Sequence, residues 1–195
     1  IYTEIFKIFQ KEKVKYADFQ FYPIFYKKNL DTKNKLIIDY KDSFHIIKFF
    51  NLKIVNINTN IIDLSSELDE LESNLNKEFR KEFKKEFYEK IKILVINKNN
   101  YDINQIEKYF NLFKKLHIMA ANRLTRPHKS WDQMLLLLKK GNTSLFVAEY
   151  DNRFISGLYC NQFHGLAAPW SQANSNKKIL KKYSIRHFLE WYAIK

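Results

Sequence analysis

Glycine, proline and cysteine are scarce in this chain, which has three glycines, three prolines and one cysteine among its 195 residues. Three glycines cannot supply the loops G-x-x-x-x-G-K-[ST] and G-x-G-x-x-G, so nucleotide sites of those two designs are excluded for this sequence. The serine turn G-x-S-x-G is also absent. With so little glycine and proline, a loop-rich or fibrous protein is not expected.

Cysteine is limited to Cys160, so no intrachain disulfide can form and no disulfide partner is expected. That usage fits a reducing cytoplasm. The five histidines are scattered and neither H-E-x-x-H nor C-x-x-C occurs, so no metal site is predicted. Long apolar runs are missing too, since none approaches the ~20 residues that a membrane helix needs.

The two ends of the sequence give two expectations. The first residues, IYTEIFKIFQKEK, lack the basic, apolar and small-residue regions of a signal peptide, so we expect a cytoplasmic protein. Residue 1 is isoleucine, and the sequence stops within the predicted helix RHFLEWYAIK. We therefore expect a fragment of a longer protein, with part of any active site lying outside it.

Positive charge is abundant, with a formal net charge of +13 and an isoelectric point near 9.6. Such a field attracts nucleic acid, anionic lipid or a phosphate-bearing ligand. The alternative is compositional, because lysine, asparagine and isoleucine are the residues that an A/T-rich genome encodes most often. The lysines are also spread along the whole length. Both interpretations stay open.

The first half of the chain predicts short strands followed by one long helix. Residues 12–63 contain aromatic and β-branched runs separated by polar turn residues. From residue 65 to 89, apolar residues recur at three- and four-residue steps, which predicts a continuous helix. Its segment KEFRKEFKKEF is either an electropositive binding face or a solvated face with Glu–Lys pairs, and the interleaved carboxylates favour the second.

The second half predicts the succession strand, two helices, three strands and a final helix. Residues 92–97 read as a buried strand, and SLFVAEY and RFISGLYCNQF as a hairpin. GLAAPWSQA reads as a third strand that ends at Pro169. The predicted capping and turn residues are Asp102 with Gln105 for the first helix, Ser130 with Gln133 and Gly141 for the second, Asp151-Asn152 for the hairpin, and Ser184 for the last helix.

The connector AANRLTRPHKSWDQM concentrates groups that bind anions. Arg123 and Arg126 can each hold a phosphate or carboxylate with two parallel hydrogen bonds, and Thr125 offers a hydroxyl. Pro127 disfavours helical geometry at the residue before it. The alternative is a helix end whose last carbonyls are covered by the arginines. The residues alone do not favour either the anion-binding site or the covered helix end.

Two further places carry candidate residues. LAAPWSQAN brings Trp170 and Ser171 to the end of a strand, where they either line a substrate groove or pack. His164 and His187 are candidate general bases, because histidine titrates near neutral pH. A lone histidine is more often structural.

The order of these motifs resembles that of FemAB-like acyltransferases, a branch of the GNAT superfamily. The resemblance covers roughly residues 58–195 and rests on four successive stretches: NIIDLSSELDELESNLNKEFRKEFKK, INQIEKYFNLFKKLHIMAANRLTRPHKSW, LFVAEYDNRFISGLYCNQFHGLAAPWSQAN and IRHFLEWYAIK. It implies an α/β (α+β) fold, with a GNAT-like mixed sheet flanked by helices. Two such units are implied: residues 1–97, incomplete and carrying the long helix 65–89, and residues 98–195, truncated at the end.

The resemblance also implies a reaction, in which an acyl or aminoacyl group moves from acyl-CoA or aminoacyl-tRNA to an amine. The implied acceptors are peptidoglycan precursors and other cell-envelope or glycan building blocks of bacterial type. No bound cofactor and no DNA partner are expected. Peripheral contact with an anionic membrane would suit the charge.

Classical CoA-binding members of the superfamily carry a glycine-rich pyrophosphate loop, which would lie near residues 184–186, but KKYSIRHF has no glycine. FemAB-like enzymes often lack this loop, so its absence is compatible with the resemblance. Lys181, Lys182 and Arg186 could supply charge there, which makes Arg186 the candidate residue for the cofactor part of the donor. Arg123 and Arg126 would anchor an anionic group, Trp170 and Ser171 would line the acceptor groove, and His164 would be the base.

Two competing functions stay open beside the acyltransferase. The first is a non-catalytic basic domain that binds RNA or acidic glycans, which accounts directly for the charge and predicts a steep salt dependence. The second is a decayed or truncated enzyme without activity of its own. The fold of residues 98–195 separates these functions best.

Overall fold

A computed structural model describes residues 62, 64, 66–163, 166–175 and 182–195. Asn60–Lys195 form one compact unit. The described elements are, in order, α3 (Leu68–Ser73), α4 (Lys77–Glu82), α5 (Glu86–Glu89), β1 (Lys92–Ile96), α6 (Ile103–Ala121), α7 (His128–Lys140), β2 (Thr143–Tyr150), β3 (Arg153–Phe163), β4 (Leu166–Asn174) and α8 (Ile185–Ile194). From β1 onward this is the predicted succession. The strands predicted within residues 12–63 lie almost wholly outside the described residues.

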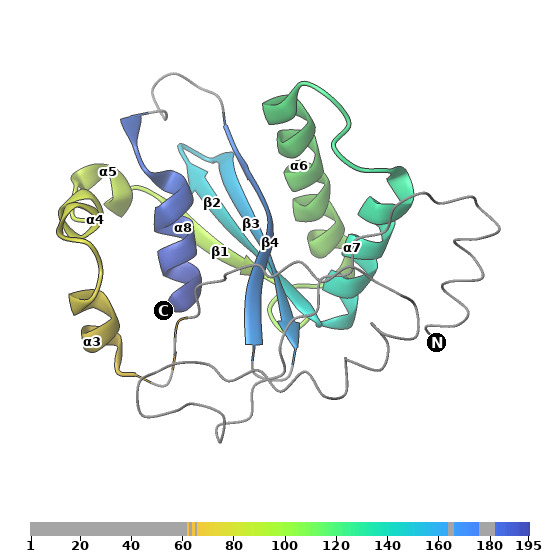
Figure 1. Cartoon of the computed structure of the whole chain (residues 1–195). Helices are drawn as coiled ribbons and strands as arrows, with labels where there is room; N and C mark the ends of the chain where they lie inside the picture. Colours follow the sequence, from red (N-terminus) through yellow and green to blue (C-terminus); the bar gives the residue numbers. More distant parts are fainter. Residues whose placement is uncertain (1–61, 63, 65, 164–165, 176–181) are drawn as a thin grey trace, which may run out of the picture. The chain divides into compact units, whose positions relative to one another are not determined.

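The four strands form one sheet in the order β1-β2-β3-β4, and every pairing is antiparallel. Helices α6 and α7 pack on one face of this sheet, and α8 packs on the other (Figure 1). The predicted α/β fold, with a sheet flanked by helices, is confirmed. β1 and β4 are the two outer strands of the described sheet.

Both faces of the sheet are buried, which explains why β2 reads as a nearly continuous apolar run. Leu145 and Val147 point toward α6 and α7, whereas Phe146 and Ala148 point toward α8. Successive side chains of a strand point to opposite faces, so the two sets belong to two separate cores.

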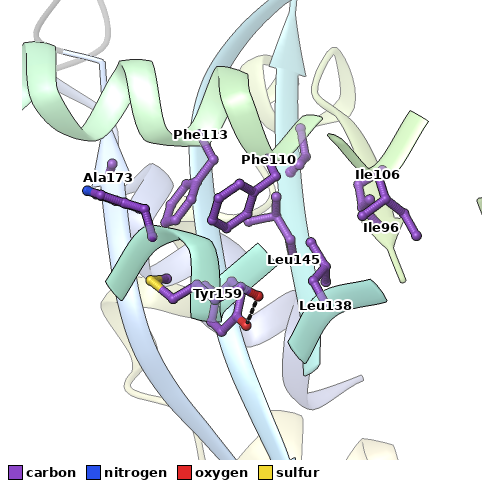
Figure 2. Packing of buried hydrophobic residues seen from close by; sticks show 11 residues of the cluster. Ile96, Ile106, Phe110, Phe113, Leu138, Leu145, Tyr159 and Ala173 are labelled. Carbon is purple, nitrogen blue, oxygen red and sulfur yellow. Dashed lines mark hydrogen bonds between the residues drawn. The ribbon is translucent and has the colours of Figure 1, made fainter. Parts of the chain in front are cut away.

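The core under α6 and α7 is dominated by aromatic rings and large aliphatic side chains (Figure 2). Phe110 and Phe113 of α6 meet Trp131 of α7 edge-on, with ring centroids 6.0 and 6.1 Å apart. Tyr159 of β3 lies between the helices and the sheet, and its hydroxyl donates a hydrogen bond to the Met134 carbonyl at 2.7 Å. This bond ties α7 to the middle of the sheet.

Some of the predicted capping and turn residues are confirmed and one is wrong. The Asp102–Gln105 capping box is confirmed, and so is the tight turn at Asp151-Asn152, where φ is 52° and 53°. Ser130 does not cap α7, which begins at His128 after Pro127. Helix formation there starts one turn earlier, because proline's fixed φ suits a helix start.

Strand β4 does not end at Pro169 as predicted but continues to Asn174. β3 pairs Tyr159 with Ser171 and then Cys160 with Pro169, so Trp170 is an extra residue in a β-bulge. Proline has no N–H to donate, and an outer strand with a bulge is where a sheet tolerates it.

The continuous helix predicted from residue 65 to 89 is wrong, since the structure has the three short helices α3, α4 and α5 instead. Asn76 caps α4 by accepting a hydrogen bond from the Glu78 N–H at 2.8 Å, and Lys85 is extended with ψ 140°. α5 packs against the start of α8, where Phe87 stacks on the Tyr183 ring at 3.6 Å.

Helix α8 begins at a point that α5 supports. Ser184 is at its N-cap, as predicted, but makes no side-chain capping bond. Instead, the Ser184 N–H donates to the Tyr88 hydroxyl at 2.8 Å, and that hydroxyl donates to Glu82 at 2.8 Å. Lys85 completes the group by pairing with Glu82.

The division of the chain into units 1–97 and 98–195 stays a prediction. Within the described residues, β1 pairs with β2 from Lys92–Glu149 to Ile96–Leu145, so residues 92–96 are hydrogen-bonded into the sheet of the later unit. No described helix combines the length and apolar character that crossing a membrane requires. Cytoplasmic location also stays a prediction.

The backbone at Gly157 lies close to two aromatic rings of the core under α6 and α7. A Cβ there would lie 2.6 Å from Cδ2 of Phe113 and 3.0 Å from Cζ of Phe154. We expect Gly157→Ala to lower the free energy of unfolding by about 1–3 kcal/mol, because the α6 core must shift to admit it. Urea unfolding measures the change. The same alanine should cost less in a Phe113→Leu background, and an equal cost in both backgrounds would contradict the close approach.

Glu82 should make stability depend on acid pH. Partial burial alone would raise the pKa of Glu82, but hydrogen bonds from Lys85 and Tyr88 and the charge of Lys85 outweigh it and hold the pKa below its ordinary value of 4.5. A lowered folded-state pKa means that the stabilisation is complete above about pH 4.5 and is lost as the pH falls through the folded-state value.

We therefore expect Glu82→Gln to be less stable than the parent chain at pH 7 and this difference to become smaller at pH 3. Urea unfolding at the two pH values tests this. Glu78→Gln on the same helix is the control, because the Glu78 side chain is exposed. A stability difference that is the same at both pH values would count against the pairing.

Candidate functional site

Four polar side chains from three elements meet where α6 ends beside the outer strand. His117 lies in the last turn of α6, Thr125 and Arg126 lie in the connector to α7, and Ser171 lies on β4. The connector turns back toward the sheet because Asn122 takes a left-handed conformation with φ 52°, which ends the helix. We call His117, Thr125, Arg126 and Ser171 the polar cluster.

The polar cluster is a continuous chain of hydrogen bonds. Nη1 of Arg126 donates to Oγ of Ser171 at 2.8 Å, and that oxygen lies 3.1 Å from Nε2 of His117. The other ring nitrogen of His117, Nδ1, lies 3.1 Å from Oγ1 of Thr125. Because Arg126 can only donate, Ser171 is free to donate its proton to Nε2, and Nδ1–H then donates to Thr125. In that arrangement each hydrogen bond of the polar cluster has one donor and one acceptor.

His117 is suited to accept a proton. It packs edge-on against the rings of Phe113 and Trp131, with centroids 5.8 and 5.4 Å away. Burial lowers the pKa of His117 below its ordinary value of 6.5, and the nearby Arg126 charge lowers it further. The imidazole is therefore neutral at pH 7, with Nε2 directed at Ser171.

Arg126 is a half-buried cation held in place on several sides. Its Cζ lies 5.1 Å from the Trp131 ring centroid and 5.7 Å from that of Trp170. Nη1 also contacts Sδ of Met134 at 3.4 Å. Burial lowers the pKa of Arg126, and among the described residues no carboxylate lies within ion-pair distance of it.

The bulge in β4 places one aromatic ring at the rim of the polar cluster. Trp170 is 43% exposed, and its ring centroid lies 5.8 Å from that of Tyr159. The next residue, Ser171, is buried and faces α6 and α7, as does Ala173. The extra residue therefore joins an exposed tryptophan to a buried serine in two consecutive positions.

The structure brings together four of the residues singled out from the sequence, namely Thr125, Arg126, Trp170 and Ser171. Arg123 is exposed and makes no contact with the polar cluster. Arg186 lies at the start of α8, on the other face of the sheet, where it pairs with Glu190 at 3.1 Å. His164 lies outside the described residues.

His117 was missed, and it is the residue that links the others. Its position offered a signal, since it follows Phe113 by four residues and Phe110 by seven and so continues the buried stripe of α6. A polar residue on such a stripe needs a buried partner. The partner, Ser171, is 54 residues away, which no local pattern reveals.

His187, the second candidate base, contacts Glu190 at 3.0 Å and the Phe79 ring on the α8 side of the sheet. It therefore does not take part in the polar cluster. Within the part of the chain that the structure describes, no group of three or more histidine, cysteine or acidic side chains could hold a metal ion.

Comparison with known proteins gives matches among solved structures alone. No protein-family model and no curated protein matches the sequence. Among solved structures, the chain is similar to the crystal structure of an aminoglycoside acetyltransferase from an uncultured soil metagenomic sample, in complex with sisomicin. The identity is 19%, the match covers 55% of this chain and 74% of that chain, and the TM-score is 0.37. At these values the likeness says nothing about substrate or reaction.

The pKa of His117 should respond to Arg126. We expect a midpoint below 6.5 for the His117 ring in the parent chain and a rise in Arg126→Gln, because the positive charge is removed while burial remains. Arg126→Lys should keep most of the depression. NMR titration of the His117 ring protons measures all three midpoints. The same midpoint in the parent chain and Arg126→Gln would show that the two side chains do not interact.

Proposed function

We propose that this chain belongs to an acyltransferase that moves an acyl or aminoacyl group from acyl-CoA or aminoacyl-tRNA to an amine. The observation that supports the proposal is the Ser171–His117 pair, a hydroxyl bonded to a neutral imidazole at 3.1 Å. Transfer to an amine needs a group that takes up the proton released from the nucleophile, and this pair is the one in the polar cluster with that capacity.

In the proposed reaction the amine nitrogen attacks the carbonyl carbon of the thioester or ester. A C–N bond forms, the bond from carbon to sulfur or oxygen breaks, and the leaving thiolate or alkoxide takes up the proton that His117 returns through Ser171. The proton lost by the nitrogen passes to Ser171 Oγ while the Ser171 proton passes to Nε2 of His117. No covalent enzyme intermediate is needed, because the amine is itself a sufficient nucleophile.

The remaining tasks are placing the two substrates and stabilising the oxyanion. β4 is an outer strand of the described sheet, and backbone N–H groups on the edge of β4 that faces away from β3 would donate to the oxyanion. Arg126 would anchor an anionic substrate group, with Thr125 fixing the His117 tautomer and Trp170 lining the acceptor groove. Arg123 would contribute at the rim.

The identity of the two substrates rests on the resemblance to FemAB-like acyltransferases. The acceptor would be an amine of a peptidoglycan precursor or another envelope or glycan building block. Lys182 and Arg186, before and in the first turn of α8, would meet phosphates of the donor. Part of the Arg186 charge is already used by Glu190, so its contribution would be partial.

A binding function without catalysis has one observation in its favour. Lys77, Arg80, Lys81 and Lys84 line one hollow along α4. Two of the carboxylates interleaved with them are engaged elsewhere, Glu82 with Lys85 and the Glu86 side chain with Lys90. In this alternative, these four cations would meet RNA or an acidic glycan.

His117→Gln and Ser171→Ala separate the two functions. We expect either change to lower kcat for acyl transfer by about 10²–10⁴-fold, because each interrupts proton removal, while the donor Kd stays the same. The parent rate should fall only below pH 6.5, since the lowered pKa keeps His117 neutral above it. Release of CoA or tRNA measures the rate.

His128→Gln is the matched control, because His128 is exposed at the start of α7 and takes no part in the polar cluster. Full activity in both His117→Gln and Ser171→Ala would overturn the proposal. A protein that transfers no acyl group yet binds RNA with a steep salt dependence would support the binding function instead.

A further inference from the structure

We propose that Arg126 binds a carboxylate of the acceptor, so that the substrate is an amine that also carries a carboxylate group. This inference rests on the proposed function and names the substrate class for the same site. It follows from which edge of the guanidinium is free, from the missing counter-ion and from the place of the ring of Trp170.

The guanidinium of Arg126 has one nitrogen occupied and one edge free. Nη1 meets both Ser171 Oγ, at 2.8 Å, and Met134 Sδ, at 3.4 Å. Nη1 carries two hydrogens, so these two contacts use it fully. The edge formed by Nε and Nη2 has no hydrogen-bond partner among the described residues. These two parallel donors are spaced to match the two oxygens of a carboxylate.

The charge of Arg126 also lacks a counter-ion. Its neighbours in the polar cluster are a serine and a histidine that is neutral at pH 7. No aspartate or glutamate in the described part of the chain lies within 4.0 Å of Arg126. A cation withdrawn from water without an opposite charge is costly, and a bound anion removes that cost.

The aromatic rings decide from which side the anion arrives. The Trp131 ring is fully buried, whereas the Trp170 ring is 43% exposed, and both lie within 6 Å of Arg126 Cζ. A ligand therefore enters past Trp170 and meets the guanidinium at its edge rather than its face. The Trp170 ring offers an apolar surface for the body of the ligand.

A carboxylate fits this place better than a phosphate. A phosphate with two charges usually gathers several cations, whereas Lys114, which lies over the same Trp131 ring at 6.0 Å from its centroid, is directed at that ring. Lys114 makes no bond to the polar cluster among the described residues. The Arg126 guanidinium is planar and carries one positive charge, so it matches a carboxylate, which is planar and carries one negative charge.

The position of the carboxylate also orients the amine. Arg126 and Ser171 are in direct contact, so an acceptor held by its carboxylate extends its amine along β4 toward Ser171 Oγ. The carboxylate thus fixes the distance between the amine and the Ser171–His117 pair. An amine without a carboxylate would lose that positioning.

The test compares two small probes that differ only in the carboxylate, 5-aminopentanoate and 5-aminopentanamide. Ligand-observed NMR titration of the full chain gives Kd for each, with inorganic phosphate as a third probe. We expect the carboxylate to bind at least about 10-fold more tightly than the amide in the parent chain. Arg126→Gln should bring the ratio to about one. Arg153→Gln, a matched change at an exposed arginine in the β2–β3 hairpin, should leave it unchanged.

Several results would overturn the inference: equal Kd values for the two probes in the parent chain, an unchanged ratio in Arg126→Gln, or tighter binding of phosphate than of 5-aminopentanoate. If Arg126→Gln does not fold, Arg126→Lys decides, because it keeps the charge but loses the fork. An unchanged ratio in that variant overturns the side-on geometry. Binding needs no turnover, so a protein that prefers the carboxylate but transfers no acyl group would contradict the proposed function and leave this site standing.

Discussion

The hydrogen bond from the Tyr159 hydroxyl to the Met134 carbonyl sets the position of α7 on the sheet, and the polar cluster depends on that position. Met134 presents its sulfur to Arg126, and Trp131, one turn earlier, presents its ring. Tyr159 is also the strand partner of Ser171. One buried tyrosine therefore aligns the helix that carries the aromatic wall with the strand that carries the serine. Burial raises the pKa of Tyr159 to about 12, which keeps the hydroxyl protonated and able to donate.

Local signals in the sequence were sufficient for the order of the elements but not for their ends. The apolar run of β2 and the capping box at Asp102 are properties of neighbouring residues, and both predictions are confirmed. The helix over residues 65–89 was misread, because its apolar spacing is regular while its bends come from contacts with α8. The apolar periodicity indicates which residues are buried. Three short helices can bury the same residues as one continuous helix, so the periodicity does not distinguish them.

The residues of the candidate site also fall into those that the sequence indicated and one that it did not. Thr125 and Arg126 stood out because a connector rarely concentrates such side chains, and Trp170 and Ser171 because they end an apolar strand. His117 did not stand out, since its role depends on β4 lying beside the end of α6. The roles of all these residues in binding and transfer stay predictions, whereas their proximity is a property of the fold.

Pro169 has a consequence for how copies of this chain meet. An outer strand with a full row of free backbone donors invites another strand to add to it, which leads to chains joining edge to edge. In β4 the proline removes one donor and the adjacent bulge at Trp170 breaks the regular spacing of the others. This irregularity would interrupt regular pairing of a further strand with this stretch of β4.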